Sequence, residues 1–349
     1  MPALAVADAL RAEGTEVSFI GAEGRAEAEA VPAAGYEIEL LRVRGLDRRN
    51  PLRAAGSLRL AAAAIPAAGR ALRARRAQAV LGGGGYVAGP AGLAALRLGL
   101  PLVLSEADRH LGLTNRLLAR RAHRVCLAFP IEGYEGSRFV VTGRPVPGAI
   151  GAADRDAARE RFGIAAGDRC LLVFGGSQGA RSINLCALAA FSGPEASGRD
   201  FHVLHISGNR DHEAARAALA AAPNPERYTL LAYEPGLADA LAASDLVLAR
   251  SGGSIFEIAA AGCPSILVPY PYASQRHQHA NAAWMADAGA AVVLEDSELE
   301  PDTLRGLAGE LLGDPERLAG MASAARGLAR PDAAERVAAE LLGAIRESS

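Results

Sequence analysis

Residues 245–281 constrain the fold of this chain more than any other stretch. They run as a short apolar segment, a glycine turn, a helix, a second apolar segment and a loop leading into another helix. The apolar run at 246–248 has the continuous hydrophobicity of a parallel strand buried on both faces. Ser251, Gly252 and Gly253 then expose backbone N–H groups where the next helix starts, which favours phosphate. Because ligands of open α/β sheets bind beyond the carboxyl ends of strands, we expect a binding site here.

Glu257, in the helix after this glycine turn, has two interpretations. It lies one turn into the helix, close enough to accept hydrogen bonds from a sugar diol beside the phosphates. Ser254 and Glu257 also have the S-x-x-E spacing of a capping box, in which the carboxylate binds only its own helix. The spacing alone leaves both open. His277 and His279 do not predict a metal site, because residues two apart lie on different faces of a helix.

The same alternation of strands and helices continues through the chain and predicts two domains. With 349 residues, half of them hydrophobic, the chain is long enough for two cores. The segment GRPVPG at 143–148 breaks the composition and is the expected hinge. We therefore expect an α/β fold with two Rossmann-like domains, at residues 1–145 and 149–330, whose parallel sheets face each other across a cleft. The helix expected at 332–346 follows the second domain and is expected to pack back on the first.

Composition excludes several classes of function. A net charge of −2 argues against general nucleic-acid binding. All 37 basic residues are arginine, which excludes Schiff-base chemistry and Walker-type phosphate binding through lysine. The four cysteines are far apart and lack C-x-x-C spacing, which favours free, buried thiols. No apolar run approaches the roughly 18 residues of a membrane span.

Two segments of the first half carry groups suited to chemistry. An apolar run at 79–81 leads into GGGGYVAG, a candidate phosphate cradle because glycine lets backbone N–H groups approach an anion closely. The apolar run at 101–104 is followed by Glu106 and Asp108, two carboxylates available for acid–base work. The alternative for both acids is that they are solvated loop residues.

Residues 42–76 are strongly basic, with ten arginines and one aspartate interleaved with leucines. A basic helix with leucines on its other side suits the surface of an anionic membrane. The alternative is a solvated helix face whose leucines pack inward.

Several motifs together resemble one family. GGYVAGP at 84–90, LGLTN at 111–115, GGSQGA at 175–180 and the pattern RSG…EIAAAG…VPYP…HQ..NA at 250–282 follow in order and at compatible spacing. They resemble the MurG family, peptidoglycan N-acetylglucosaminyltransferases of GT-B architecture, over about residues 2–345. The resemblance implies an inverting hexosyltransferase that moves GlcNAc from UDP-GlcNAc to lipid I and forms lipid II. It also implies a peripheral protein on the cytoplasmic face of the plasma membrane, with cell-wall synthesis proteins as further partners.

The resemblance assigns roles residue by residue. Ser177 contacts the donor phosphates, Glu257 the ribose hydroxyls, and the backbone near Glu234 the uracil. Gln278, with His277, holds the GlcNAc hydroxyls. The implied donor-binding set is Arg144, Ser177, Gln178, Gly179, Glu234, Gly252, Gly253, Ser254, Glu257, His277, Gln278 and Asn281, with Asp108 facing the sugar.

The first domain is assigned the acceptor. Gly84, Gly85 and Tyr86 cradle the acceptor diphosphate, and the arginines of residues 48–76 dock on an anionic membrane surface. Glu106 is our candidate for the catalytic base, and Asp108 is the second candidate. No metal or other cofactor is expected, and the sequence leaves open whether a divalent ion stimulates the reaction.

The chain departs from the family pattern at four places. The family begins with a strand and a GGTGGH-type loop just before the position of Pro2, so we expect the natural product to be longer. Asp108 stands where asparagine is usual. Pro147 replaces an arginine on the uracil side, with Arg144 close by. The turn at 250–257 is one residue shorter.

Three alternatives remain. Another GT-B lipid glycosyltransferase would differ mainly in the acceptor half. A UDP-GlcNAc epimerase would need several acid–base residues in the cleft, and the sequence offers few. A non-catalytic scaffold would bind the UDP-sugar without transferring it.

Overall fold

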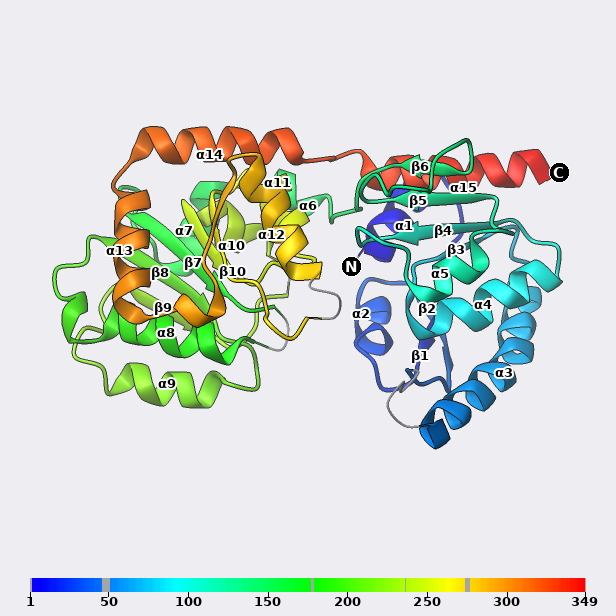
Figure 1. The fold of residues 1–349 in the computed structure, drawn as a ribbon, viewed down its shortest axis with the longest axis horizontal. Coiled ribbons are helices and arrows are strands. Elements are labelled where there is room, and N and C mark those ends of the chain that lie inside the picture. Colours follow the sequence, from blue (N-terminus) through cyan, green and yellow to red (C-terminus); the bar gives the residue numbers. More distant parts are fainter. Residues whose placement is uncertain (1, 46–50, 177–178, 236, 274–276, 349) are drawn as a thin grey trace. The chain divides into compact units, whose positions relative to one another are not determined.

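A computed structural model describes residues 2–45, 51–176, 179–235, 237–273 and 277–348, with side chains described from residue 55 onward after the first gap. The chain forms two compact units (Figure 1). The first consists of Met1–Pro147 and Arg330–Ser349, and the second of Gly148–Ala329. Both are built from parallel strands alternating with helices, which confirms the predicted α/β class.

The first unit contains two separate parallel sheets in one layer. Its elements are α1 (Pro2–Ala12), β1 (Ser18–Ala22), α2 (Glu27–Ala33), β2 (Glu37–Leu41), α3 (Pro51–Ala74), β3 (Val80–Gly82), α4 (Gly85–Arg97), β4 (Leu102–Glu106), α5 (Leu113–Leu118), β5 (Arg124–Leu127), β6 (Phe139–Val141) and α15 (Ala333–Ser348). β1 pairs with β2, and β3, β4, β5 and β6 form the second sheet in that order.

The same helices cover both of these sheets. Ile20 of β1 and Val80 of β3 belong to one apolar cluster with buried alanines of α3 and α4. On the other face, Val17 and Leu81 pack with residues of α1 and α15. Among the described residues, β1 and β3 each have a strand neighbour on one side only. The same helices nevertheless pack against both strands.

The last helix, α15, returns to the first unit. Its residues Val337 and Leu341 are buried against Val6 and Leu10 of α1. Arg336 donates a hydrogen bond from Nη2 to the carbonyl of Val141 at 2.9 Å. The chain thus enters the second unit once, at 147–148, and leaves it once, at 329–330.

The second unit has one continuous sheet of six parallel strands, in the order β12-β11-β10-β7-β8-β9. Its elements are α6 (Ala149–Ala152), α7 (Arg155–Phe162), β7 (Arg169–Phe174), α8 (Arg181–Ser192), η1 (Pro194–Ala196), β8 (Phe201–Ile206), α9 (His212–Ala220), β9 (Tyr228–Leu231), α10 (Ala238–Ala243), β10 (Leu246–Ala249), α11 (Ile255–Ala260), β11 (Ser265–Leu267), α12 (His277–Asp287), β12 (Ala291–Val293), η3 (Asp296–Glu298), α13 (Pro301–Leu312) and α14 (Pro315–Leu328).

Strand order places a switch point between β7 and β10. From β7 the chain adds β8 and β9 on one side, and then crosses over to add β10, β11 and β12 on the other. Right-handed crossovers put α8 and α9 on one face and α10, α11 and α12 on the opposite face. β7 and β10 are paired from Leu246 with Leu171 to Ala249 with Phe174, so their carboxyl ends lie side by side. Ligands of such sheets bind at this point.

The cysteines agree with the prediction from their spacing. All four are free and buried. Burial raises the pKa of the Cys126 and Cys170 thiols to about 12, so both stay protonated near neutral pH. Such thiols pack as small apolar side chains.

Candidate functional site

The turn after β7 is shaped by two glycines. A Cβ on Gly175 would overlap the backbone nitrogen of Ala180, and one on Gly179 would overlap the carbonyl oxygen of Ser207. Gly179 also has a φ of +75°, which favours glycine. The turn leads into the twelve-residue helix α8, whose N-cap, Ala180, supplies no side-chain hydrogen bond. Its first N–H groups are therefore not capped by Ala180, as an anion site requires. The predicted Ser177 and Gln178 lie outside the described residues.

The turn after β10 lacks the serine half of the capping box that the spacing allowed. Ser254 is the N-cap of α11, but its side chain makes no capping hydrogen bond. Glu257 lies in the first turn of this six-residue helix. The hydroxyl half of the capping box is absent, and the prediction that Glu257 serves a ligand stays a prediction. Gly252 and Gly253 lie in the same turn, beside the carboxyl end of β7.

Helix α12 brings two predicted residues against this turn. Asn281 donates from Nδ2 to the carbonyl of Ser251 at 3.0 Å, and the Ser251 hydroxyl donates to the carbonyl of Gln278 at 2.8 Å. The side-chain oxygen of Gln278 accepts from the backbone of Tyr270 at 2.9 Å. A Cβ on Gly252 would lie 3.8 Å from Nε2 of Gln278. Gln278 therefore faces the turn with its amide nitrogen, whereas Asn281, 5% exposed, holds the backbone in place.

Glu234 has its side chain fully engaged. It lies in the loop after β9, and both its carboxylate oxygens accept from Nη2 of Arg161 at 2.9 Å. Nη1 of the same arginine donates to Asp239 at 2.6 Å. The hydrogen bond to Glu234 is the main reason why the pKa of Arg161 is raised. Because the carboxylate of Glu234 is paired with Arg161, the predicted contact with uracil would be made by the backbone near Glu234. Gly236, two residues on, lies outside the described residues.

The remaining donor-site predictions are divided between the units. His277 begins α12 in the second unit. Arg144 and Asp108 belong to the first unit, in the segment after β6 and in the loop after β4. The prediction that they share one site with Gln278 stays a prediction.

The structure argues against Glu106 as a catalytic base. This residue ends β4 and is only 7% exposed. Its Oε1 accepts from the backbone nitrogens of Ala107 at 3.0 Å and Asp108 at 3.2 Å. Its Oε2 accepts from the nitrogen of Gly112 at 2.8 Å and from Nδ2 of Asn115 at 3.0 Å. A base needs a lone pair directed at the acceptor hydroxyl, and here four N–H donors occupy the carboxylate.

Glu106 therefore anchors the loop of residues 107–112. Its role as the catalytic base stays a prediction, which these four hydrogen bonds disfavour. The sequence could not show this, since the directions of backbone N–H groups depend on the folded loop. Asp108, the second candidate, is half-buried and sits within the anchored loop.

The predicted acceptor cradle begins a helix. Gly84 and Gly85 have φ values of +79° and +75°, which favour glycine at both. They precede and open the thirteen-residue helix α4, which has no side-chain cap. Tyr86 is 52% exposed, and a Cβ on Gly45 would lie 2.6 Å from its ring. An exposed, uncapped helix start beside a tyrosine suits an anionic group.

No metal or membrane-spanning element is found in the described part of the chain. Among these residues, no three of the His, Cys, Asp and Glu side chains gather closely enough to hold an ion. No described helix is both long and apolar enough to cross a bilayer.

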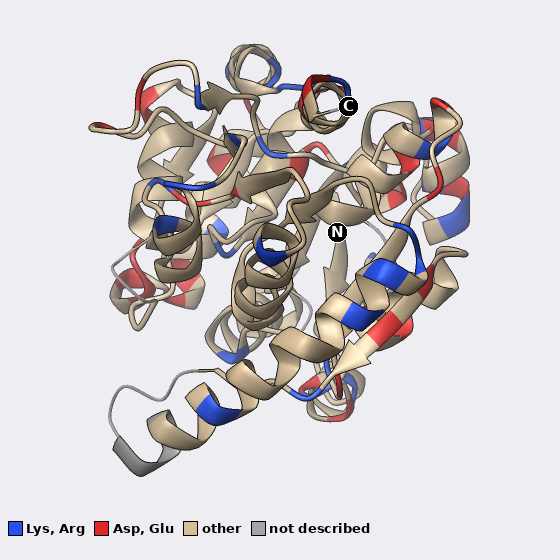
Figure 2. Cartoon of the chain, turned by 90° about the vertical axis from the view of Figure 1, so that its right-hand side faces the viewer, with Lys and Arg blue, Asp and Glu red and all other residues tan. Residues whose placement is uncertain are grey.

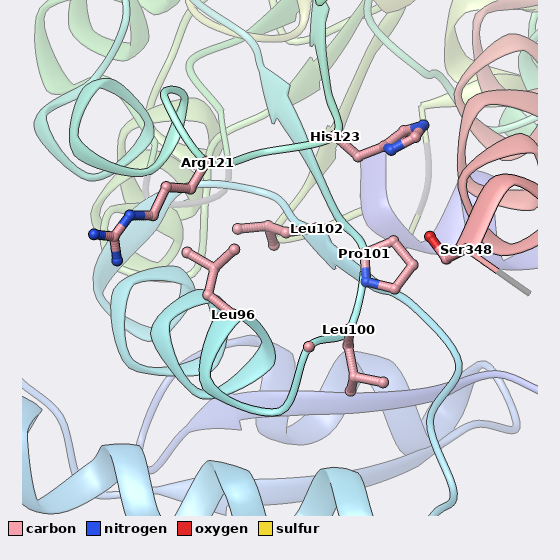
Figure 3. A pocket seen from close by; sticks show the side chains of 8 residues that line it. Leu96, Leu100, Pro101, Leu102, Arg121, His123 and Ser348 are labelled. Carbon is pink, nitrogen blue, oxygen red and sulfur yellow. The ribbon is translucent and has the colours of Figure 1, made fainter.

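A pocket of about 250 Å³ in the first unit has none of the predicted site residues in its lining (Figure 3). Its lining includes Leu100, Pro101 and Leu102, at the amino end of β4, together with Arg121 and His123. Glu106 marks the opposite, carboxyl end of the same strand. The candidate site of the second unit lies at the strand ends and glycine turns described above, and this pocket is not part of it.

Comparison with known proteins decides the family. Residues 1–127 match the glycosyltransferase family 28 N-terminal domain, and residues 170–337 match the glycosyltransferase family 28 C-terminal domain. A relative from Halorhodospira halophila is 43% identical over 338 residues, covering 97% of this chain and 92% of the relative. A relative from Rubrobacter xylanophilus is 40% identical over 348 residues, covering 99% of this chain and all of the relative. Both are named UDP-N-acetylglucosamine–N-acetylmuramyl-(pentapeptide) pyrophosphoryl-undecaprenol N-acetylglucosamine transferase.

A solved structure agrees. The crystal structure of Acinetobacter baumannii MurG superposes with a TM-score of 0.75 at 31% identity, covering 98% of this chain and 95% of that one. The chain belongs to the MurG family. This membership confirms the predicted resemblance, the GT-B class of fold and the prediction of a glycosyltransferase. The calicheamicin glycosyltransferase CalG4, with a TM-score of 0.66 and 20% identity, shows the same fold.

Proposed function

We propose that the chain transfers GlcNAc from UDP-GlcNAc to lipid I, the undecaprenyl-pyrophosphoryl N-acetylmuramyl-pentapeptide, and so forms lipid II for peptidoglycan. The observation that carries the proposal is the switch point of the second unit. Two glycine turns meet there at the paired ends of β7 and β10, with Gln278 facing one of them. Membership of the MurG family over nearly the whole chain supports the choice of substrates.

We assign the donor to these strand ends from the chemistry of the groups found there. The diphosphate lies at the start of α8, where N–H groups and the helix dipole stabilise negative charge. Glu257 accepts the ribose hydroxyls, and the amide of Gln278 reads the GlcNAc hydroxyls. The backbone beside Glu234 contacts the uracil, while Arg161 fixes that residue through its carboxylate.

The acceptor is assigned to the first unit. Its diphosphate lies at Gly84, Gly85 and Tyr86, at the start of α4. In an inverting transfer, the acceptor hydroxyl attacks the anomeric carbon of GlcNAc as the bond to UDP breaks. A base takes the proton of the hydroxyl, and the leaving diphosphate keeps the electron pair and is stabilised electrostatically. With Glu106 engaged as a loop anchor, Asp108 is our candidate for the base within this chain, a role specific to this chain because asparagine is usual at this position in the family.

Helix α3 is the proposed contact with the membrane. Its described arginines are exposed at Arg59, Arg70 and Arg73, and Figure 2 shows basic positions along the helix. Leu58, next to Arg59 in the sequence, is 61% exposed, whereas Leu72 is buried, so only part of the apolar surface packs inward. Exposed arginine next to an exposed leucine suits an anionic lipid surface on the cytoplasmic side. Arg48 lies outside the described residues, as does the side chain of Arg53.

The membrane contact is tested by flotation with anionic and neutral vesicles. Arg59→Gln combined with Leu58→Ser should reduce binding to anionic vesicles. Arg216→Gln removes an exposed arginine of the second unit and serves as the control. Equal binding of the two variants would reject α3 as the contact.

The function is tested by transfer of labelled GlcNAc to a lipid I analogue, with diacylglycerol as the competing acceptor class. Transfer to lipid I alone supports the proposal, and transfer to diacylglycerol would replace it with another lipid glycosyltransferase. Binding of UDP-GlcNAc without transfer would favour a scaffold. In calorimetry, Glu257→Ala should weaken UDP-GlcNAc binding by ~10-fold or more, since hydrogen bonds to charged groups are worth about 1.5–3 kcal/mol. Glu298→Ala, an exposed acid of the same unit, is the matched control.

A further inference from the structure

Arg250 occupies the switch point of the six-stranded sheet. It follows β10 directly, and its side chain is only 10% exposed. A buried guanidinium requires partners, since an unpaired charge in the interior is strongly disfavoured. The partners identify what this arginine holds together.

The guanidinium contacts the ends of three other strands or the segments that follow them. Its Nη2 donates to the hydroxyl of Ser182 in the first turn of α8, at 2.6 Å. Its Nη1 lies 2.6 Å from Oδ1 of Asp296 in η3, which follows β12. The same nitrogen donates to the carbonyls of Val268 and Pro269, after β11, at 3.2 Å each.

Ser182 and Asp296 also bind each other. The Ser182 hydroxyl donates to Oδ1 of Asp296 at 2.9 Å, which closes a triangle with Arg250. This triangle, which we call the switch-point cluster, joins the phosphate side of the site, at α8, to segments on the far side of β10. Because protein acceptors engage both terminal nitrogens of Arg250, the cluster is built to hold these segments in position.

The cluster continues toward the sugar side of the site. The guanidinium of Arg250 lies 5.4 Å from the ring centre of Tyr270, whose backbone nitrogen donates to the side chain of Gln278. The residue after Arg250, Ser251, donates to the backbone of Gln278. Two short paths therefore lead from the switch-point cluster to Gln278, one to its side chain and one to its backbone.

We propose that Arg250, Ser182 and Asp296 are positioning residues that fix the spacing between the diphosphate site at α8 and the sugar-reading Gln278. This inference rests on the proposed function. Its consequence is specific. Loosening the cluster should cost affinity for UDP-GlcNAc, which spans both sides, more than affinity for UDP, which lacks the sugar. A residue that only stabilised the fold would lower both affinities alike.

The decisive experiment compares the affinities of UDP-GlcNAc and UDP by calorimetry. Asp296→Asn keeps the shape of the side chain but removes the charge that pairs with Arg250. We expect the ratio of the two affinities to fall by ~10-fold, with a rise in KM for UDP-GlcNAc larger than the change in kcat. Glu298→Gln changes an exposed acid in the same 3-10 turn and should leave the ratio as in the unaltered chain.

Ser182→Ala provides a milder variant in case Asp296→Asn does not fold. It removes one hydroxyl and should lower the ratio by about 3-fold, while thermal unfolding stays close to that of the unaltered chain. An unchanged ratio in a folded Asp296→Asn variant, or in Ser182→Ala if the first does not fold, would overturn the inference. The proposed function would then still stand on the binding and transfer by the unaltered chain. Failure of the unaltered chain to bind UDP-GlcNAc would overturn both.

Discussion

The two units use the same alternation of strand and helix but differ in how completely their strands are paired. The second unit has six strands in one sheet, and its paired strands β7 and β10 present the donor site. In the first unit, two helical layers cover a pair of strands and a separate group of four. Among the described residues, β1 and β3 each keep an edge that pairs with no other strand. The donor site thus lies on strands that are paired on both sides, whereas the described strands β1 and β3 of the first unit are each paired on one side only.

The largest expected effect concerns these edges. A version extended at its N terminus by an apolar strand and a glycine-rich loop should add that strand in parallel to β1 and β3, through a right-handed crossover by α1. Pairing both edges and burying apolar surface should stabilise the first unit by several kcal/mol. Hydrogen exchange of the β1 and β3 amides measures the effect. An extension of equal length that alternates glycine and serine is the control, and equal protection by the two extensions would show that the edges accept no strand.

The next effect distinguishes the units by pH. Burial, and then the nearby His212, lowers the pKa of His205 in β8 to about 3, from an ordinary value of 6.5. The folded state therefore favours neutral His205. The resulting stability is fully present above about pH 6.5 and is lost as the pH falls toward 3, by up to about 5 kcal/mol.

Thermal unfolding between pH 7 and pH 4 should show the second unit losing stability, and His205→Gln should flatten that dependence. His205 also binds Tyr228 and Asn184, so the variant should be less stable at pH 7. His123→Gln, in the first unit, is the control. A pH dependence that survives in His205→Gln would assign it to other groups.

A third prediction separates the two acids of the first unit. Asp108→Asn should lower turnover by ~10²-fold, because it removes the proposed base while keeping a side chain of the same shape. Since asparagine is usual at this position in the family, unchanged turnover would reject Asp108 as the base. Glu106→Gln should lower turnover less, by ~10-fold, and should also lower thermal stability, because it disturbs the four hydrogen bonds that anchor the loop.

The pH profile of kcat decides between these roles. The limb that reports the base should disappear in Asp108→Asn and persist in Glu106→Gln. The reverse result would restore Glu106 as the base. Affinity for UDP-GlcNAc should change little in Glu106→Gln, because the donor is assigned to the second unit.

The smallest expected effect is at the surface of the first unit. Arg75, just after α3, pairs with Glu37 of β2, and both side chains are substantially exposed. Arg75→Gln should destabilise the protein by less than about 1 kcal/mol, since water and salt screen such pairs. Chemical denaturation measures this, and a larger loss would indicate that α3 depends on the pair.

The sequence predicted the second unit well for a physical reason. Its strands are short apolar runs buried on both faces, and the glycine turns after β7 and β10 require glycine for close backbone approach. β12 was missed because only three residues form it and Val293 is exposed. The helix α2 was missed as well, since it contains a proline and only one buried residue.

Side-chain contacts over long sequence distances were beyond prediction. The partners of Arg250 are Ser182 and Asp296, and no local pattern in the sequence connects these three positions. The same is true of Glu106, whose role depends on where four N–H groups point. The apolar run at 101–104 predicted the position of the strand end. The folded loop, however, decides whether a carboxylate there faces a substrate or its own backbone.

The return of α15 to the first unit has a practical consequence for dissecting the protein. The second unit is one uninterrupted segment of chain, so a gene fragment covering 148–329 encodes all of it. The first unit comes in two pieces, yet Gly143 and Arg330 nearly touch, with a Cβ on the glycine 2.6 Å from that of the arginine. A short linker can therefore join the pieces, so that each unit is encoded by a single gene.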